Sequence, residues 1–401
     1  MSYSHDLILV WGLLGLVSIL LGHLSRRIGA PLLLVFLVIG MLAGEDGPGG
    51  IQFESFNTSY LVGSIALAII LFEGGLKTDR QAVRLAALPA TALATVGILI
   101  TAALTGIAAH LLTGTPIVFG LLIGAVMAPT DAAAVASLLR GLPFHVPTRL
   151  HAVLEIESGL NDPMSVFLVL LLCEQAVHPG SHTVGGVATL FLKEMGGGAL
   201  LGLGGGFGMV MLLKRVRLEA SLVPILGLFA ILLLFAISQV LGTSGFLAVF
   251  IAGVMVGQSR YPSDIELGHF IEGLAWLAQI VLFLMLGLLA TPHALTPLIV
   301  PSLAIAAVLI LVARPLATFA CLTPLGFSWR ESGFISWVGL RGGVPIFLTV
   351  IPMLEGVKNA NLLFGAAFVL VIISLIVQGW TVGPAARILG IGRESDGAAG
   401  V

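Results

Sequence analysis

The sequence predicts an all-α membrane protein of about thirteen transmembrane helices, built as two inverted six-helix repeats in which helices 5 and 12 are broken and cross. Three observations predict this fold. The composition is too apolar for a water-soluble domain, thirteen apolar runs approach the thickness of a bilayer, and one constant shift aligns the two halves of the chain.

The composition points to lipid as the main solvent. Hydrophobic residues make up 58% of the chain and charged residues 9%, whereas about a quarter of an ordinary soluble domain is charged. The eighteen Lys and Arg residues are spread along the chain without a large basic patch and the net charge is −2, so nucleic acid is not an expected partner. Cys173 and Cys321 lie in apolar runs and are expected to be buried side chains, without disulfide or zinc. No basic segment or cleavage site marks a signal peptide before the first run, which we expect to be a retained helix.

The apolar runs predict the order and orientation of the spans. A helix needs about 20 apolar residues to cross a bilayer. We expect spans at 7–25, 30–44, 60–75, 88–112, 115–138, 150–174, 187–213, 220–241, 244–258, 268–290, 296–321, 332–354 and 362–389. Fourteen basic residues follow odd-numbered spans, and the loops after even-numbered spans carry only Lys358. By the positive-inside rule the N-terminus is outside and the C-terminus cytoplasmic.

An internal repeat predicts the architecture. A shift of 213 residues places Gly40 on Gly253, Gly74 on Gly287, and the residues Pro129-Thr130-Asp131 of span 5 on 342–344 of span 12. The shift amounts to seven spans, an odd number, so the halves have opposite orientations. Inverted repeats with paired broken helices are typical of secondary transporters. The expected units are a first repeat (1–174), a linker with span 7 (175–219), an inverted second repeat (220–390) and a short cytoplasmic tail (391–401).

Five charged side chains fall deep inside predicted spans. They are Asp131, Glu157, Asp162, Arg314 and Arg341. Each ionised side chain at such depth costs at least about 2.5–3.5 kcal/mol, so each needs a partner or a function. For Arg314 we expect the long side chain to reach the membrane surface.

Span 6 contains the sequence ESGLNDP at 157–163. Glu157 with Asn161, and Ser158 with Asp162, are i, i+4 pairs on adjoining faces of the helix, so a polar stripe runs along one side of it. Pro129 and Pro163 remove backbone hydrogen bonds, which would release the carbonyl oxygens of Ala125 and Gly159. Carbonyls, hydroxyls and a carboxylate suit a hard cation such as Na⁺ or K⁺, and no nitrogen or sulfur ligand indicates a transition metal. No cofactor is expected.

The strings PTD in span 5, ESGLND in span 6 and GLRGGVP in span 12, with GTSGFLAVF and LFEGGL, resemble the NhaP-type monovalent cation/proton antiporters. The stretch PLLLVFLVIGMLAGEDGPGG is similar to the potassium/proton antiporter branch of that family. The resemblance covers residues 7–390 and implies the NhaA/NhaP-like antiporter fold. Several members of that branch carry a cytoplasmic regulatory portion after the last span, so we expect either the transport core alone or missing regulation.

The resemblance also implies roles for site residues. Asp162 corresponds to the carboxylate that carries the proton and the cation in turn, and Asn161 to the residue that steadies the crossing of the broken helices. The cation site would comprise Thr130, Asp131, Ser158 and Asp162. For Asp131 the alternative is a helix cap, and for Asp162 a structural carboxylate.

Further implications of the resemblance are an ion pair and an assembly. Glu157 and Arg341 would form a structural ion pair that neutralises both charges. The protein would be a homodimer in a bacterial inner membrane, with spans 5, 6 and 12 in a mobile bundle. From its position, Glu73 lies within a few residues of Lys77 near the cytoplasmic end of span 3. We therefore expect it at the membrane–water interface or, as the alternative, in the entry funnel of the ion path.

The predicted function is exchange of a monovalent cation for H⁺. K⁺ is the favoured cation, and Na⁺ is the alternative. Because position 161 is Asn, where the resemblance places a second Asp in antiporters that move unequal charge, we expect electroneutral one-for-one exchange. A passive cation channel is an alternative. An intramembrane enzyme is a third possibility, for which the sequence offers no nucleophile-and-base arrangement.

Overall fold

A computed structural model describes residues 11–22, 32–53, 55–140, 146–181, 183–216, 219–259, 261 and 264–391. Most of the predicted tail (391–401) lies outside the described residues, as do Arg26, Arg27, Arg217 and Arg260 of the charge pattern. Within the described part, regular structure is helical, apart from an isolated bridge between Gly44 and Ile51.

After a first helix at Trp11–Gly22, the helices follow in chain order. They are α2 (Leu32–Ala43), α3 (Phe56–Lys77), α4 (Arg80–Ala92), α5 (Ile98–Thr113), α6 (Ile117–Met127), α7 (Ala132–Arg140), α8 (Thr148–Val177), α9 (Val184–Phe191), α10 (Gly197–Arg215), α11 (Leu222–Val240), α12 (Gly245–Gly257), α13 (Asp264–Leu288), α14 (Pro292–Leu295), α15 (Ile299–Val308), α16 (Arg314–Leu322), α17 (Trp329–Trp337), α18 (Gly343–Leu348), α19 (Val350–Leu354) and α20 (Ala360–Leu389). Short π-helical turns η1 (Leu93–Gly97), η2 (Leu192–Gly196) and η4 (Leu309–Ala313), and 3₁₀ turns η3 (Thr296–Leu298) and η5 (Thr323–Leu325), link several of them.

These helices confirm the predicted spans. Among the described residues, eight continuous helices are long and apolar enough to cross a membrane, and five shorter apolar helices accompany them. Each overlaps one of the thirteen predicted runs, and several extend a few residues beyond it. Spans 4, 7 and 11 are each made of helical pieces joined by a π-helical turn, α4 with α5, α9 with α10, and α15 with α16. Spans 5 and 12 are broken, at residues 128–131 and 338–342.

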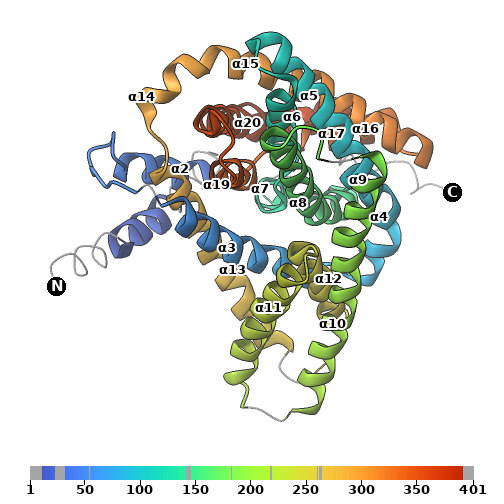
Figure 1. The fold of residues 1–401 in the computed structure, drawn as a ribbon. Helices are drawn as coiled ribbons and strands as arrows, with labels where there is room; N and C mark the ends of the chain where they lie inside the picture. The colour runs from blue at the N-terminus through green and yellow to red at the C-terminus, as the bar shows by residue number, and fades with distance from the viewer. Residues whose placement is uncertain are drawn as a thin grey trace.

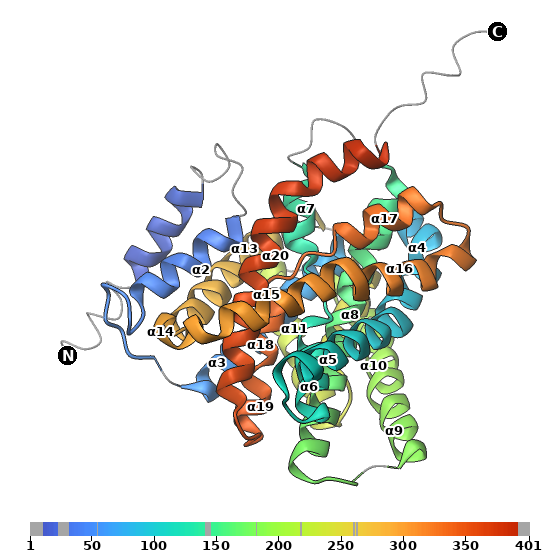
Figure 2. The same ribbon diagram turned by 90° about the horizontal axis from the view of Figure 1, so that it is seen from above.

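The helices form two groups (Figure 1). In one group α4 packs on α8, α5 on α6 and α15, and α17 and α18 on α20. In the other, α3 packs on α12 and α13, α2 on α13, and α10 and α11 on α12. Figure 2 shows α15 and α16 running beside α5 in the first group. The groups meet where α3, α12 and α13 contact α8, α18 and α19, and the candidate functional site lies near this boundary.

The close contacts of the second group reflect the repeat. A Cβ added to Gly40 of α2 would collide with the carbonyl oxygen of Leu284 in α13, and one added to Gly253 of α12 would collide with that of Phe72 in α3. Gly40 and Gly253 are the residues that the 213-residue shift aligns. Small residues allow helix backbones to approach each other closely in membranes, so the two halves use the same packing device at the same position.

Candidate functional site

The break in span 5 supplies the first part of the site. α6 ends at Met127, and Pro129 cannot donate the hydrogen bond that would continue the helix. Asp131 then caps α7, because its Oδ1 accepts a hydrogen bond of 2.9 Å from the backbone N–H of Ala134. The helix-cap alternative for Asp131 is therefore observed, and the residue is fixed at the start of the second half-helix.

The break in span 12 crosses the break in span 5. The backbone N–H of Asp131 donates a hydrogen bond of 2.9 Å to the carbonyl oxygen of Leu340. A Cβ at Gly342 would overlap the carboxylate of Asp131. Glycine at position 342 therefore lets the two breaks touch, and the sequence repeat predicted that they would lie together.

Span 6 is tied to this crossing by side chains. Asn161 in α8 donates from Nδ2 to Thr130 Oγ1 at 2.7 Å, and the hydroxyls of Thr130 and Ser158 share a hydrogen bond of 3.0 Å. All three side chains are buried. Buried networks of this kind rigidify their surroundings, so Asn161 and Ser158 hold the first break against α8.

Asp162 faces a small cavity beside this network. Its side chain is only 5% exposed, and its Oδ1 has no hydrogen-bond partner among the described residues. The cavity, of about 50 Å³, is lined by Asp131, Ser158 and Asp162 among others. Thr130 is not one of the lining residues, but its hydroxyl forms a hydrogen bond with the hydroxyl of Ser158, which is. A buried, unpaired carboxylate is unfavourable by several kcal/mol, so Asp162 is suited to hold a proton or a cation.

The ion pair of Glu157 differs from the expectation. Its carboxylate forms a two-pronged pair with Arg314, with Nη1–Oε1 at 2.6 Å and Nη2–Oε2 at 3.0 Å, and both side chains are at most 1% exposed. The predicted pair of Glu157 with Arg341 is therefore wrong. The expectation that Arg314 reaches the membrane surface is also wrong, because span 11 turns its guanidinium into the core.

Arg341 binds backbone instead. Its Nη1 donates to the carbonyl oxygens of Ala128 and Pro129, the latter at 2.8 Å, and its own N–H donates to Ser374 Oγ at 3.0 Å. A cation is favourable at the C-terminus of a helix, here α6. The carbonyl of Ala125 accepts a hydrogen bond of 3.4 Å from the N–H of Ala128, so it is not released by the break as the sequence suggested.

Two further polar residues of α20 support the second break and were not singled out from the sequence. Ser374 donates to Gln378 Oε1 at 2.6 Å, and Gln378 Nε2 donates to the carbonyl oxygen of Trp337, the last residue of α17, at 2.8 Å. The sequence feature that could have identified them is their i, i+4 spacing in an otherwise apolar run.

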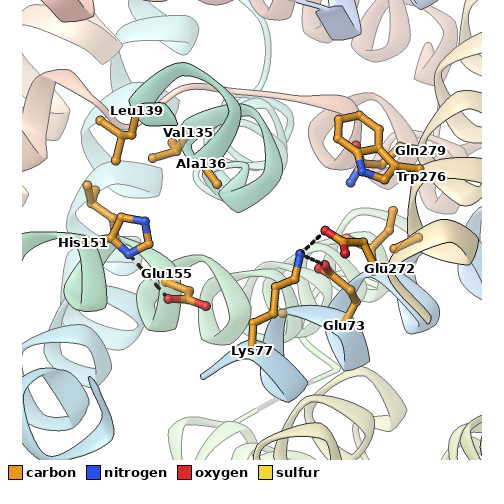
Figure 3. A pocket seen from close by; sticks show the side chains of 14 residues that line it. Glu73, Lys77, Val135, Ala136, Leu139, His151, Glu155, Glu272, Trp276 and Gln279 are labelled. Carbon is orange, nitrogen blue, oxygen red and sulfur yellow. Dashed lines mark hydrogen bonds and ion pairs between the residues drawn. The ribbon is translucent and has the colours of Figure 1, made fainter. Parts of the chain in front are cut away.

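A wider cavity of about 140 Å³ leads toward the site between α3, α7, α8 and α13. Figure 3 shows the ammonium of Lys77 between the carboxylates of Glu73 and Glu272, at 2.5 and 2.9 Å. His151 and Glu155 of α8 face them, with Nδ1–Oε2 at 3.6 Å. Glu73 therefore lies in the wall of this cavity and is paired with Lys77.

Comparison with sequence families gives one extended match. The family described as "Sodium/hydrogen exchanger, transmembrane" matches residues 13–388. Among curated proteins, the chain is 46% identical over 386 residues to the K(+)/H(+) antiporter NhaP of Alkalimonas amylolytica and 45% identical over 382 residues to the K(+)/H(+) antiporter NhaP2 of Shewanella oneidensis. Both matches cover 95% of this chain and 66% of the relative, so the chain spans just under two thirds of their length. A Na(+)/H(+) antiporter, NhaS2 of Synechocystis, is 29% identical over 78% of this chain and 57% of its own.

Comparison with solved structures identifies the same fold. The sodium proton antiporter MjNhaP1 of Methanocaldococcus jannaschii at pH 8 superposes with a TM-score of 0.78 at 22% sequence identity, covering 94% of this chain and all of the other. A second structure of that protein, from electron microscopy, gives a TM-score of 0.76 at 21% identity over 96% of this chain and 98% of the other.

Proposed function

The chain belongs to the sodium/hydrogen exchanger family, and from this premise we propose that it is a secondary active transporter, not an enzyme, that exchanges a monovalent cation for H⁺. The observation that carries the proposal is Asp162, a buried carboxylate with an unpartnered oxygen, beside two crossing helix breaks and at the end of a cavity. We assign Asp162 as the carrier, and Thr130, Asp131 and Ser158 as the other cation-binding residues, with Asn161 in support.

The mechanism is competition for one carboxylate. A protonated Asp162 cannot bind a cation, and a cation-loaded Asp162 cannot keep its proton. Each loaded form neutralises the buried charge, whereas the empty ionised site would carry an uncompensated charge through the membrane. Only the loaded forms should therefore change access between the two sides, and this coupling distinguishes an antiporter from a passive channel.

The arrangement of the helices supports alternating access. The group with α4 to α8 and α15 to α20 would move against the group with α2, α3 and α10 to α13, carrying the crossed breaks with it. Charge distribution supports a cytoplasmic C-terminus and an external N-terminus, so the cavity of Lys77 and His151 would open to the cytoplasm. We also propose a homodimer in the bacterial inner membrane, with 1–174 and 220–390 as the repeats, 175–219 as the linker and 391–401 as the tail.

K⁺ is the cation we propose first, because the two relatives at 45 and 46% identity are named K(+)/H(+) antiporters. Na⁺ is the second candidate, supported by the NhaS2 relative and by the oxygen ligands of the site, which suit either ion.

Purified protein in liposomes with an internal pH dye tests the proposal. A proton gradient should be dissipated when K⁺, Na⁺, Li⁺ or Rb⁺ is added, and the dependence on concentration ranks the ions. Proton movement that requires no added cation, or cation flux that moves no protons, would contradict antiport.

A further inference from the structure

The cavity of Lys77 and the cavity of Asp162 share part of their lining. The residues common to both are Ile70, Gly74, Glu155 and Gln279. Glu155 is the one titratable side chain in this shared set. Its side chain is 22% exposed, between the buried Asp162 on one side and the open cavity on the other. Glu155 therefore lies where the two cavities adjoin.

Glu155 also belongs to a row of titratable groups on α8. His151 is one turn earlier and 47% exposed, and Asp162 is two turns later and buried. At a rise of about 1.5 Å per residue, Glu155 and Asp162 are separated by about 10 Å along the helix. The inner cavity of about 50 Å³ has room for a few waters, since each needs about 10–15 Å³ of such space. Exposure thus decreases step by step from His151 to Glu155 to Asp162.

The other charged groups near Glu155 have partners of their own. Glu73 of α3 and Glu272 of α13 both bind Lys77, and Asp79 caps α4 through the N–H of Ala82. Within the described residues, Glu155 contacts the imidazole of His151, with Nδ1–Oε2 at 3.6 Å. An imidazole gains and loses its proton near neutral pH, so this pair can exchange a proton where a pair with Lys would hold its charge.

We propose that Glu155 is a proton-relay residue between Asp162 and the open cavity, an inference that rests on the proposed antiport. When a cation approaches Asp162, the carboxyl O–H bond breaks and the proton passes through cavity water to the Glu155 carboxylate, forming a new O–H bond there. Glu155 then releases that proton to the His151 imidazole or to water in the outer cavity. The reverse sequence reloads Asp162 as the cation leaves.

Two kinds of exchange in the same liposomes test the relay. Exchange of K⁺ against H⁺ requires proton transfer, whereas exchange of radioactive Rb⁺ against K⁺ at equal pH on both sides moves none. Glu155→Gln should slow cation/proton exchange by at least about tenfold and leave Rb⁺/K⁺ exchange within about twofold of the wild type. The matched control is Glu272→Gln, which removes a carboxylate from the outer cavity only and should change the two rates by the same factor.

The outcomes separate the relay from other roles. An equal loss of both exchanges in Glu155→Gln would mean that the carboxylate attracts or holds the cation, and no loss in either would mean that it takes no part; both results overturn the relay. Glu155→Asp, which keeps a carboxyl one methylene shorter, carries the test if the Gln variant does not fold, with a selective slowing of proton-coupled exchange expected. Absence of cation/proton exchange in the wild type would instead refute the proposed function.

Discussion

The guanidinium of Arg314 and the carboxylate of Glu157 form a two-pronged ion pair, with N–O distances of 2.6 and 3.0 Å, between spans 11 and 6. Neither side chain has more than 1% of its surface exposed. Removing one member of such a pair leaves an unpaired buried charge, whereas removing both leaves two neutral groups.

We therefore expect Glu157→Gln and Arg314→Gln each to lower the free energy of unfolding by about 3–5 kcal/mol, and the double variant to recover part of that loss. Thermal unfolding in detergent with added lipid measures the effect. The matched control combines Glu157→Gln with Arg341→Gln, which should show no recovery because Arg341 binds the carbonyls of Ala128 and Pro129.

Asp162→Asn should fold and insert normally but should not exchange cations for protons. The amide keeps the shape of the side chain and loses the charge that titrates. Proton-gradient dissipation in liposomes measures exchange, and size-exclusion profiles confirm folding. Near-normal exchange by this variant would remove Asp162 from the role of carrier.

Gly342→Ala should be destabilising and inactive, because its Cβ would overlap the Asp131 carboxylate where the two breaks touch. Overpacking of this kind costs about 1–3 kcal/mol. Gly204→Ala in α10, where a Cβ meets no atom within 4 Å, is the matched control and should be neutral or slightly stabilising. Melting temperatures of the two variants measure the difference in stability. If the two variants were equally stable, the crossing would tolerate a residue larger than glycine at position 342.

Exchange should be electroneutral, one cation for one proton. Glu157 is neutralised by Arg314 and Asp131 is fixed as a helix cap, so Asp162 is the carboxylate left to lose a proton as a cation binds. With the membrane potential clamped by an ionophore for an ion that is not transported, the equilibrium pH gradient should not change with voltage. A gradient that shifts with voltage would show that a second group, first of all Asp131, also carries a proton.

Asp46, in the segment between α2 and α3, should not contribute to the pH profile of exchange. Its carboxylate accepts a hydrogen bond of 3.1 Å from the backbone N–H of His293, and this bond holds the pKa of Asp46 below its ordinary value of 3.8. A lowered carboxyl pKa adds stability that is present above the ordinary value and is lost as pH falls through the lowered one. From about pH 6 to about pH 9 the group stays ionised, so Asp46→Asn should leave the shape of the pH profile unchanged in liposomes.

The fold was predictable because the features that determine it can be recognised without knowing how the helices pack. Span lengths, the prolines and glycines of the breaks, and the 213-residue repeat are all readable as patterns. The partner of Glu157 was not, because it depends on how span 11 is rotated about its axis. The π-helical turn Leu309–Ala313 directly precedes Arg314, and such a turn inserts an extra residue into the helix and rotates the residues after it. Sequence spacing alone therefore could not tell which of the two buried arginines faces Glu157.

The hydrogen bonds from Arg341 to the carbonyls of Ala128 and Pro129 bear on how ion preference can change over evolution. Those two oxygens are bound by a guanidinium, and the cation site proposed above, made of Thr130, Asp131, Ser158 and Asp162, consists of side-chain oxygens. Every residue has a backbone carbonyl oxygen, whereas a side-chain hydroxyl or carboxylate can be gained or lost by a single substitution. A shift between potassium and sodium would then need few substitutions, at positions such as Thr130 and Ser158, without rebuilding the crossing of the helices.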